Sequence, residues 1–576
     1  MAAEKNAPLI VHGDQSILLD IHTPLADQAR KAIAPFAELE KSPEHIHTYR
    51  LSHLSLWNAA AAGYDTPHIL SLLSEYSRYP LPSDMERKVA EIMGRYGMLS
   101  LVESNAQGAA NKIAWGQDNE IPLLLLVHDT FLFRMLRDNS GLHNLISPAP
   151  AGSAGRGADS SKAFFVSPKY RGKIKQELIR IGYPIQDLIP LRDGLPCAMK
   201  LTSAVRQRDY QIQAVDAFLG NLEKGTGYGT IVLPCGSGKT VVGIEVMRRL
   251  ETSTLILCPN ITALHQWKTE LLNKTTLSED DIGEYNARTK DVRKVTISTY
   301  QILTWRSRKG GEFPHLSLMT GHQWGLIIYD EVHLLPAPVF SMTAEVQAVR
   351  RLGLTATLVR EDGREREVFS LVGPKRFDVP WKDLEGRGWI SRAICKEIRV
   401  ELPESLQTDY ALAEKRKQYR IASENPRKLD ILTYLIRHHA QDQILVIGQY
   451  ISQLHTVQKH LNAPIITGAT SDTNRTALYD RFRNGDIRIL IVSKVANFAI
   501  DLPDASVAIQ ISGTFGSRQE EAQRLGRILR PKKHAAYFYT LISRYTSEED
   551  FGINRQKFLA EQGYSYILEL WEDEKT

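Results

Sequence analysis

A glycine-rich segment constrains the fold of this chain more than any other feature. Residues 233–240, Leu-Pro-Cys-Gly-Ser-Gly-Lys-Thr, follow the apolar run Thr230–Val232 and open a helical pattern that ends at Leu250. A strand that enters a helix through such a loop directs several backbone N–H groups at one point, where a phosphate group binds well. Lys239 is expected to reach the β- and γ-phosphates and Thr240 to hold Mg²⁺. The residues expected to bind the nucleotide here are Pro234, Gly236, Ser237, Gly238, Lys239 and Thr240.

An acidic pair downstream supports this interpretation, although Leu233 stands where the strict loop pattern has glycine. Residues 324–329, Trp-Gly-Leu-Ile-Ile-Tyr, predict a buried strand, and Asp330 and Glu331 follow it directly. A phosphate-loop fold places its metal-binding aspartate at the carboxyl end of such a strand. We expect Asp330 to bind Mg²⁺ and Glu331 to polarise the attacking water. An ordinary strand-to-helix turn followed by an exposed acidic strand end is the alternative, and the order of the two motifs disfavours it.

Composition narrows the class of protein without naming its ligand. The chain has 576 residues, more than one hydrophobic core normally supports, so three or four domains are expected. The net charge of +5 is small, so a nucleic-acid surface would have to come from local clustering of basic residues. Four cysteines without metal-ligand spacing favour a reducing compartment.

The most apolar run of the chain, Ile121–Val127, is too short to cross a membrane. We expect that run to be a buried strand or helix segment.

Alternating strand and helix patterns predict an α/β protein with two lobes in tandem. The first series of strands is expected at 254–257, 294–298, 326–329 and 351–354, and the second at 443–447, 464–466, 487–492, 507–511 and 536–541. Such alternation is typical of parallel sheets that are covered by helices on both faces. Smaller α+β units precede the lobes, with a strand at 16–21, helices at 51–62, 66–76 and 169–181, and a Ser/Gly/Pro-rich linker at 147–162.

Two further segments suggest how the lobes share one nucleotide. In residues 523–530, Gln-Arg-Leu-Gly-Arg-Ile-Leu-Arg, Arg527 and Arg530 are three positions apart and lie on one face of a helix. A guanidinium pair presented across a cleft would act as arginine fingers, although a solvated basic helix is the simpler alternative. Upstream of the loop, Arg208 and Gln211 precede a helix, and the Gln211 amide offers the donor and acceptor that an adenine edge requires.

Taken together, these motifs resemble the superfamily 2 helicases, and within them the bacterial type of the XPB family. The resemblance rests on residues 208–211, 234–240, 330–333, 355–357 and 523–530, and on Leu354–Asp362, Ile509–Ser512 and Gln562–Tyr566. It implies two RecA-like motor lobes, at 204–375 and 376–576, an N-terminal accessory domain at 1–105 and a damage-recognition-like domain at 106–203. It also implies an enzyme that hydrolyses ATP with Mg²⁺, travels 3′ to 5′ on DNA and opens it, in DNA repair. Gln523 would then join the nucleotide-binding residues and Arg527 and Arg530 the catalytic ones.

The resemblance also assigns DNA contacts. Arg360, Glu361 and Asp362 correspond to the RED motif of the family, which engages the junction of paired and separated strands. A thumb-like segment is expected at 410–428, where basic side chains would meet the DNA. Ala496 and Asn497 stand where many relatives have Gly-Asp, which leaves the coupling of DNA to ATP less defined than hydrolysis. The residues expected to contact DNA are Thr299, Tyr300, Arg360, Glu361, Asp362, Lys415, Arg416, Lys417, Arg420 and Lys494.

Other motors share the same motifs. A translocase on double-stranded DNA, an RNA-dependent motor and a non-catalytic nucleic-acid scaffold remain alternatives, and the intact Lys239, Asp330 and Glu331 speak against the scaffold. The expected partners are DNA as a fork, bubble or duplex and a repair nuclease or another repair protein, with no membrane. We expect a monomer in the cytoplasm, associated with the bacterial nucleoid.

Overall fold

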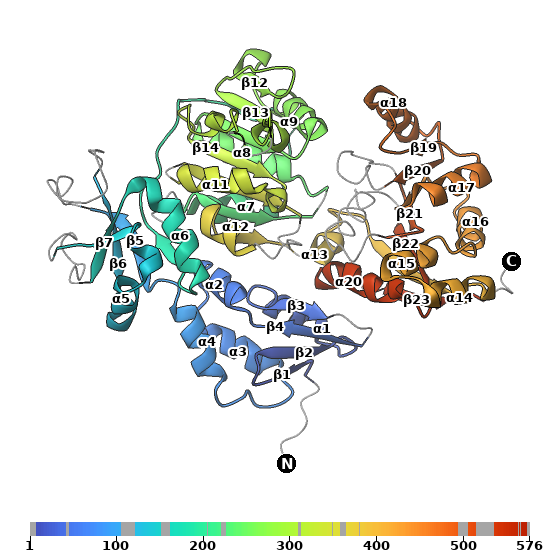
Figure 1. Ribbon diagram of the computed structural model, residues 1–576, viewed down its shortest axis with the longest axis horizontal. Helices are drawn as coiled ribbons and strands as arrows, with labels where there is room; N and C mark the ends of the chain where they lie inside the picture. Colours follow the sequence, from blue (N-terminus) through green and yellow to red (C-terminus); the bar gives the residue numbers. More distant parts are fainter. Residues whose placement is uncertain are drawn as a thin grey trace.

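The chain builds four sheet-containing units, two small and two large (Figure 1). The computed structural model describes residues 7–41, 45–104, 121–150, 162–203, 205–220, 226–234, 236–308, 311, 313–347, 349–356, 365–379, 381–493, 505–513, 535–562, 564 and 566–572. Within these residues no helix is both long and apolar enough to cross a membrane.

The first unit is an antiparallel sheet with helices packed against it. Its strands pair in the order β1-β2-β4-β3. The predicted helix at 66–76 is confirmed as α3, which begins after Asp65, whose carboxylate accepts the His68 N–H at 2.9 Å. The elements are β1 Leu9–Val11, β2 Ser16–Asp20, α1 Ala26–Ile33, β3 Glu38–Lys41, β4 Ile46–Arg50, α2 His53–Ala61, α3 Thr66–Tyr76 and α4 Met85–Gly94.

The second unit is a five-stranded mixed sheet in the order β7-β8-β6-β5-β9. The apolar run at 121–127 supplies its central strand β6, all of whose residues are buried. Two features differ from the sequence-based boundaries: β5 precedes residue 106, and β7, which pairs with β8, extends into the first two residues of the expected linker. The elements are β5 Leu99–Glu103, β6 Leu123–Val127, α5 Thr130–Arg137, β7 Ile146–Pro148, β8 Ala163–Val166, α6 Arg171–Arg180 and β9 Ile185–Asp187.

The first large unit, lobe 1, is a seven-stranded parallel sheet in the order β12-β13-β11-β14-β15-β10-β16. Its central strands β11 and β14 are mostly apolar and are buried on both faces, as a sheet covered on both sides requires. The elements are α7 Asp209–Leu219, β10 Tyr228–Val232, α8 Lys239–Leu250, β11 Thr254–Cys258, α9 Ile261–Lys274, β12 Ile282–Tyr285, β13 Val295–Thr299, α10 Tyr300–Leu303, β14 Leu326–Asp330, α11 Ala337–Glu345, β15 Arg350–Thr355, α12 Glu365–Leu371, β16 Lys375–Asp378 and α13 Trp381–Gly386.

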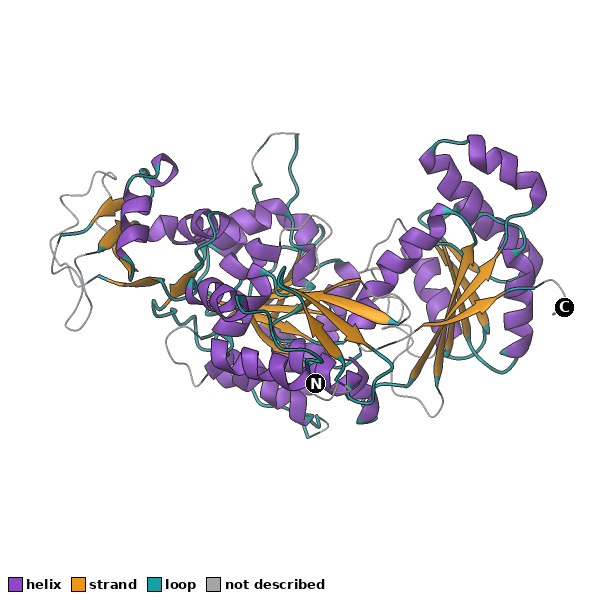
Figure 2. Cartoon of the chain, turned by 90° about the horizontal axis from the view of Figure 1, so that it is seen from below, coloured by secondary structure: helices purple, strands orange, loops and turns teal. Residues whose placement is uncertain are grey.

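The second large unit, lobe 2, repeats the architecture in the order β19-β20-β18-β21-β22-β17-β23, again parallel throughout. Helices flank both faces of each large sheet (Figure 2). The predicted α/β class with two tandem parallel-sheet lobes is thus confirmed. The elements are β17 Ala393–Val400, α14 Glu404–Leu412, α15 Lys415–Ser423, α16 Lys428–His438, β18 Ile444–Gly448, α17 Ile451–Leu461, β19 Ile465–Ile466, α18 Asp472–Arg483, β20 Ile489–Ser493, β21 Val507–Gln510, β22 Ala536–Ser543, α20 Ser547–Glu561 and β23 Tyr566–Leu570.

The first unit touches both lobes. Asn58 Oδ1 accepts the backbone N–H of Lys375 in lobe 1 at 2.9 Å, and Lys31 Nζ lies 2.6 Å from the carboxylate of Asp383 on α13. Phe369 of lobe 1 and Ala560 of lobe 2 are part of the hydrophobic core of the first unit. The N-terminal unit therefore packs at the junction of the lobes, where Figure 1 shows α20 beside β3 and β4.

Candidate active site

The phosphate loop lies between the end of β10 and the start of α8, as the sequence predicts. Gly238 has φ +85°, and a Cβ there would lie 2.5 Å from Gln211 Nε2, so only glycine fits this position. Ser237 is buried, and its hydroxyl donates to the Pro234 carbonyl at 2.6 Å. These contacts fix the backbone of the loop at the N-terminus of α8, where N–H groups have no partners within the helix and are available to a ligand.

Helix α7 holds the loop from behind. Tyr210 Oη and Gln211 Nε2 both donate to the Ser237 carbonyl, at 2.6 and 2.9 Å. Gln211 Oε1 accepts the Arg208 N–H at 2.9 Å, and the Arg208 guanidinium lies 4.8 Å from the centroid of the Trp389 ring. The Gln211 amide thus uses a donor and an acceptor to support the loop, and its contact with adenine stays a prediction.

The acidic pair meets the loop lysine. Lys239 Nζ lies 3.2 Å from Glu331 Oε1, so two residues that are 92 positions apart in the sequence form an ion pair. Glu331 adopts φ +50°, a left-handed conformation that is uncommon for a residue with a side chain. Such backbone strain clusters at functional sites, because the surrounding structure must maintain it.

Asp330 is held by Trp267, which the sequence did not single out, and by Tyr300, which was expected to contact DNA. Trp267 Nε1 donates to Asp330 Oδ2 at 3.0 Å, and Tyr300 Oη donates to the backbone carbonyl of Asp330 at 2.9 Å. Trp267 lies on α9 and Tyr300 on α10, and neither belongs to a pattern that points at the strand β14. No pattern in the sequence predicts these two contacts with Asp330, because they depend on how the helices pack over the sheet.

The two neighbouring carboxylates differ in pKa. Burial, with the charge of Glu331 added, raises the pKa of Asp330 to about 6. Burial also opposes ionisation of Glu331, but the charges of Lys239 and His333 outweigh it and lower the pKa of Glu331. His333 Nδ1 lies 2.6 Å from Thr355 Oγ1 and 3.5 Å from Glu331 Oε2. Glu331 is therefore held as an anion, the state that can polarise a water molecule.

The residues fit a magnesium ion. Among the described residues, Lys239 is the cation that lies near both the Asp330 and the Glu331 carboxylate, and His333 lies near Glu331. Two carboxylates therefore share one lysine, and the site can accept more positive charge. The Thr240 hydroxyl and the Asp330 carboxylate are hard oxygen donors, the kind that Mg²⁺ prefers. In the described part of the chain no cluster of three or more acidic, histidine or cysteine side chains forms a metal cage. A site completed by one or two protein oxygens and the nucleotide phosphates is typical of Mg²⁺.

The structure describes only part of the expected site residues. Gln523, Arg527, Arg530, Arg360, Glu361, Asp362 and Lys494 lie outside the described residues. Thr299 caps α10 and is buried, and Tyr300 is buried with its hydroxyl on Asp330. The roles of all these residues toward DNA or nucleotide stay predictions.

The segment expected to be thumb-like, 410–428, spans the end of helix α14, all of α15 and the start of α16. Helix α14 ends at Leu412 and α15 begins at Lys415. Lys415, Arg416, Lys417 and Arg420 are exposed on α15, whereas Tyr419 on its other face is buried and donates to the Gly513 carbonyl at 2.8 Å. Lys415, Arg416 and Lys417 are open to a phosphate backbone, whereas Arg420 is paired with Glu424 at 2.9 Å.

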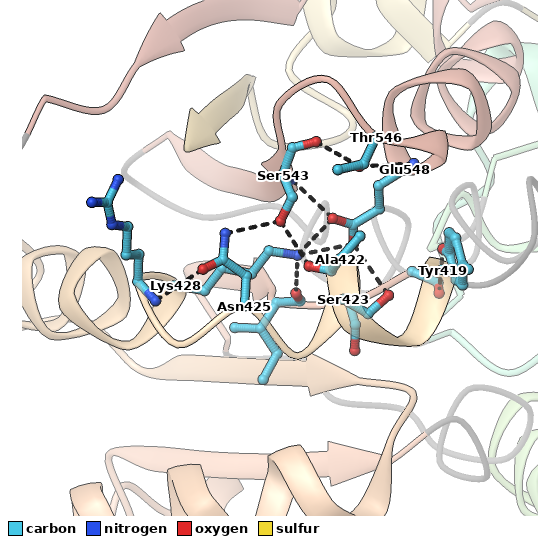
Figure 3. Close-up of polar contacts among 12 residues, drawn as sticks. Tyr419, Ala422, Ser423, Asn425, Lys428, Ser543, Thr546 and Glu548 are labelled. Atoms are coloured by element: carbon cyan, nitrogen blue, oxygen red, sulfur yellow. Dashed lines mark hydrogen bonds and ion pairs between the residues drawn. The ribbon is translucent and has the colours of Figure 1, made fainter. Parts of the chain in front are cut away.

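Lys428, which the sequence groups with these basic residues, does not belong to the exposed surface. It is buried, and its Nζ lies 2.8 Å from Glu548 Oε2 and 3.1 Å from the Ile511 carbonyl (Figure 3). Ser543 completes the network, because its N–H donates to Glu548 Oε2 at 2.9 Å. The Lys428 charge joins α16 to α20, so Lys428 is not part of the exposed basic face of the segment 410–428.

Comparison with known proteins identifies the family. A model described as the ERCC3/RAD25/XPB C-terminal helicase matches residues 384–572. The res subunit of type III restriction enzymes matches 204–360, and a helicase conserved C-terminal domain matches 9–112.

Full-length relatives agree. The DNA 3′-5′ helicase XPB of Kineococcus radiotolerans is 49% identical over 98% of this chain and 96% of its own length. That of Mycobacterium tuberculosis is 48% identical over 98% of both chains. The general transcription and DNA repair factor IIH helicase/translocase subunit XPB/SSL2 of Saccharomyces cerevisiae is 29% identical over 96% of this chain and 71% of its own length. The chain belongs to the XPB family of DNA helicases.

Proposed function

We propose that this chain is an ATP-dependent DNA helicase that moves 3′ to 5′ and separates strands. The observation that carries the proposal is the contact of Lys239, on the phosphate loop, with Glu331 at the end of β14, within the first of two parallel-sheet lobes. A loop that binds phosphate and an anionic glutamate beside it are the parts that hydrolysis of a γ-phosphate requires.

In this proposal each residue has a task. The loop N–H groups and Lys239 would bind the phosphates, at the expense of the ion pair between Lys239 and Glu331. Glu331, released from that pair, would orient and polarise the attacking water. Arg527 and Arg530 of lobe 2 would place positive charge on the γ-phosphate when the lobes close. Loss of that phosphate would weaken the closed state, and the opening of the lobes would move the DNA strand.

We further propose Mg²⁺ as the cofactor, held by Thr240 and Asp330. When bound, it would supply positive charge to the phosphate oxygens. A role in DNA repair, a repair nuclease or another repair protein as partner, a monomeric state and a cytoplasmic, nucleoid-associated location complete the proposal. The support for repair is that the yeast relative is a subunit of a general transcription and DNA repair factor.

The test separates binding from turnover. We expect Lys239→Ala to abolish ATP hydrolysis and to weaken ATP binding, because the phosphates lose their cation. Glu331→Gln should abolish hydrolysis but still bind a fluorescent ATP analogue, because only the polarising anion is lost. Turnover near the wild-type rate in either variant would remove this site from the mechanism.

Substrate class is decided by a second measurement. ATP hydrolysis with forks, bubbles, duplex DNA and RNA duplexes is compared beside a strand-displacement assay. Strand separation on DNA forks supports the helicase, stimulation by duplex DNA without separation indicates a translocase, and a preference for RNA indicates an RNA-dependent motor.

A further inference from the structure

A surface on lobe 1 combines an exposed tryptophan with cations and has no role in the site described above. Trp305 follows α10, and 51% of its surface is exposed, which is uncommon for so large an apolar side chain. Four of the other tryptophans, Trp57, Trp267, Trp324 and Trp381, are at most 2% exposed. An exposed aromatic ring of this size marks a contact surface rather than part of the core.

Neighbouring rings fix the position of Trp305. Its ring centroid lies 5.8 Å from that of His315, and the His315 ring meets Tyr285 at 5.7 Å, edge to face. Tyr285 Oη and His315 Nδ1 are 2.8 Å apart, within hydrogen-bond distance. Burial, with the charge of Lys290 added, lowers the pKa of His315, so this support is neutral at pH 7. Trp305 is thus presented on a rigid base instead of a free loop.

Cations surround the rings. Lys290 Nζ lies 4.9 Å from the Tyr285 ring centroid, and the Arg306 guanidinium lies 5.3 Å from that of Phe313. Both cations are exposed, and neither forms an ion pair within the described residues. The nearest carboxylate on β12, Glu284, is paired with Lys268 at 3.0 Å. The Trp305 patch, defined as Tyr285, Lys290, Trp305, Arg306, Phe313 and His315, is therefore both aromatic and positively charged.

The location connects the patch to the nucleotide site. Tyr285 ends β12, and α10 follows directly on β13, so the patch lies at the carboxyl ends of these parallel strands. Ligands of open parallel sheets bind at that edge. In the same short helix α10, Tyr300 donates its hydroxyl to the backbone of Asp330 at 2.9 Å. A ligand on Trp305 would thus contact the element that touches the proposed metal-binding strand end.

We infer that the Trp305 patch binds single-stranded nucleic acid, with Trp305 stacked on an unpaired base and Lys290 and Arg306 on the flanking phosphates. Stacking needs an open base face, which a single strand offers and the interior of a duplex does not. The cations bind either form, because phosphates are common to both. This inference rests on the proposed function. It adds that the bound nucleic acid is single-stranded and that Trp305 contacts one of its bases.

The test compares single-stranded and duplex DNA on the full chain. Dissociation constants for a labelled oligo(dT) and for a blunt DNA hairpin are measured at one salt concentration. Trp305→Ala and Trp305→Leu should each weaken binding of oligo(dT) about tenfold, because the π face is lost, and change hairpin binding less than about twofold. Trp305→Phe should retain most of the affinity for oligo(dT). Arg306→Gln should weaken both ligands and reduce the dependence of binding on salt.

Controls separate the possible failures. Tyr79→Ala removes an aromatic ring that is also 51% exposed, on the first unit, and should leave oligo(dT) binding unchanged. Equal binding of oligo(dT) by wild-type, Trp305→Ala and Trp305→Phe proteins would overturn the inference and leave an acidic protein surface as the partner of the patch. Failure of the helicase proposal is seen separately, as a wild-type chain that shows no DNA-stimulated ATP hydrolysis.

Discussion

At the scale of single residues, the pKa values of two adjacent carboxylates are shifted in opposite directions. Asp330 and Glu331 are neighbours in the chain, yet burial raises the pKa of the first, while Lys239 and His333 overcome burial and lower the pKa of the second. The difference arises from their surroundings, because Asp330 receives its side-chain hydrogen bond from the neutral Trp267. Pairs of this kind, whose pKa values are pushed apart, mark sites of acid and base chemistry.

Asp330→Asn should stabilise the protein without ligand and abolish ATP hydrolysis. The pKa of Asp330 is raised from 3.8 to about 6, so the folded state favours the protonated form, and that contribution to stability is lost as pH rises through about 6. Asparagine still accepts from Trp267 and carries no charge. We expect the variant to gain at most about 3 kcal/mol in free energy of unfolding at pH 7.5, the equivalent of a shift of about two pKa units, and less at pH 5.

Urea denaturation of both proteins at pH 5 and pH 7.5 measures this difference. A gain in stability that is the same at both pH values would show that the charge of Asp330 is not its cause. Asp378→Asn serves as the control, because Asp378 is an exposed carboxylate on β16, the edge strand of the same sheet.

At the scale of elements, a buried ion pair determines how α16 and α20 meet. Lys428 is 2% and Glu548 0% exposed in their side chains, and the pair is completed by the Ile511 carbonyl and the Ser543 N–H (Figure 3). A buried pair costs much desolvation, so its main effect is to fix one geometry against others. Here it fixes the start of α16 beside the ends of β21 and β22.

Lys428→Met should destabilise lobe 2 by about 3–5 kcal/mol, because the Glu548 carboxylate is left buried without its cation. Adding Glu548→Gln should recover part of this loss, since the uncompensated charge is removed. Urea denaturation of the two single variants and the double variant measures the coupling. Arg437→Met, on the exposed side of the same helix, should have little effect. A loss for Lys428→Met no larger than for Arg437→Met would contradict the role of the pair.

At the scale of the whole molecule, the second unit is joined to lobe 1 by a buried charge cluster. Arg171 donates to both oxygens of Asp187, at 3.0 and 2.9 Å, and Lys175 Nζ lies 2.5 Å from Asp187. Lys175 also donates to Gln347 Oε1 of lobe 1 at 2.8 Å. Gly172 packs against the backbone of Ala344 on α11, where a Cβ would come within 2.2 Å of the carbonyl oxygen. The contact is therefore close as well as charged, and we expect the two units to move together.

Lys175 makes this junction sensitive to pH. Burial, which outweighs the charge of Asp187, lowers the pKa of Lys175 from 10.5 to about 7. The unfolded chain then binds more protons than the folded chain above pH 7, so stability should rise with pH from about 7 to about 10, by at most about 1.4 kcal/mol per pH unit. Lys175→Met should flatten this rise.

Urea denaturation at pH 7, 8 and 9 measures the slope for the wild type, for Lys175→Met and for Lys173→Met, an exposed neighbour on α6. A slope that is the same in all three proteins would show that Lys175 does not titrate in this range.

The comparison of sequence with structure shows which signals are local. The strands expected at 254–257, 326–329 and 443–447 form β11, β14 and β18 with ends that shift by one residue at most, because each is a short apolar run with polar ends. The burial of Lys428 has no local signal, since a basic residue in a basic helix is normally solvated and only its partner Glu548, 120 positions later, reveals it. The domain boundaries stay predictions, although β5 and β7 pair in ways that composition does not reveal.

By itself, the sequence determined the phosphate loop, the acidic pair, the α/β class with two parallel-sheet lobes and the family, because each depends on residues close together in the chain. Only the tertiary structure decided that Lys239 meets Glu331, that Trp267 and Tyr300 hold Asp330, that Lys428 is buried and that Trp305 stands exposed among cations. The physical reason is that contact, burial and pKa depend on which distant segments pack together. Periodicity and spacing along one segment do not contain that information.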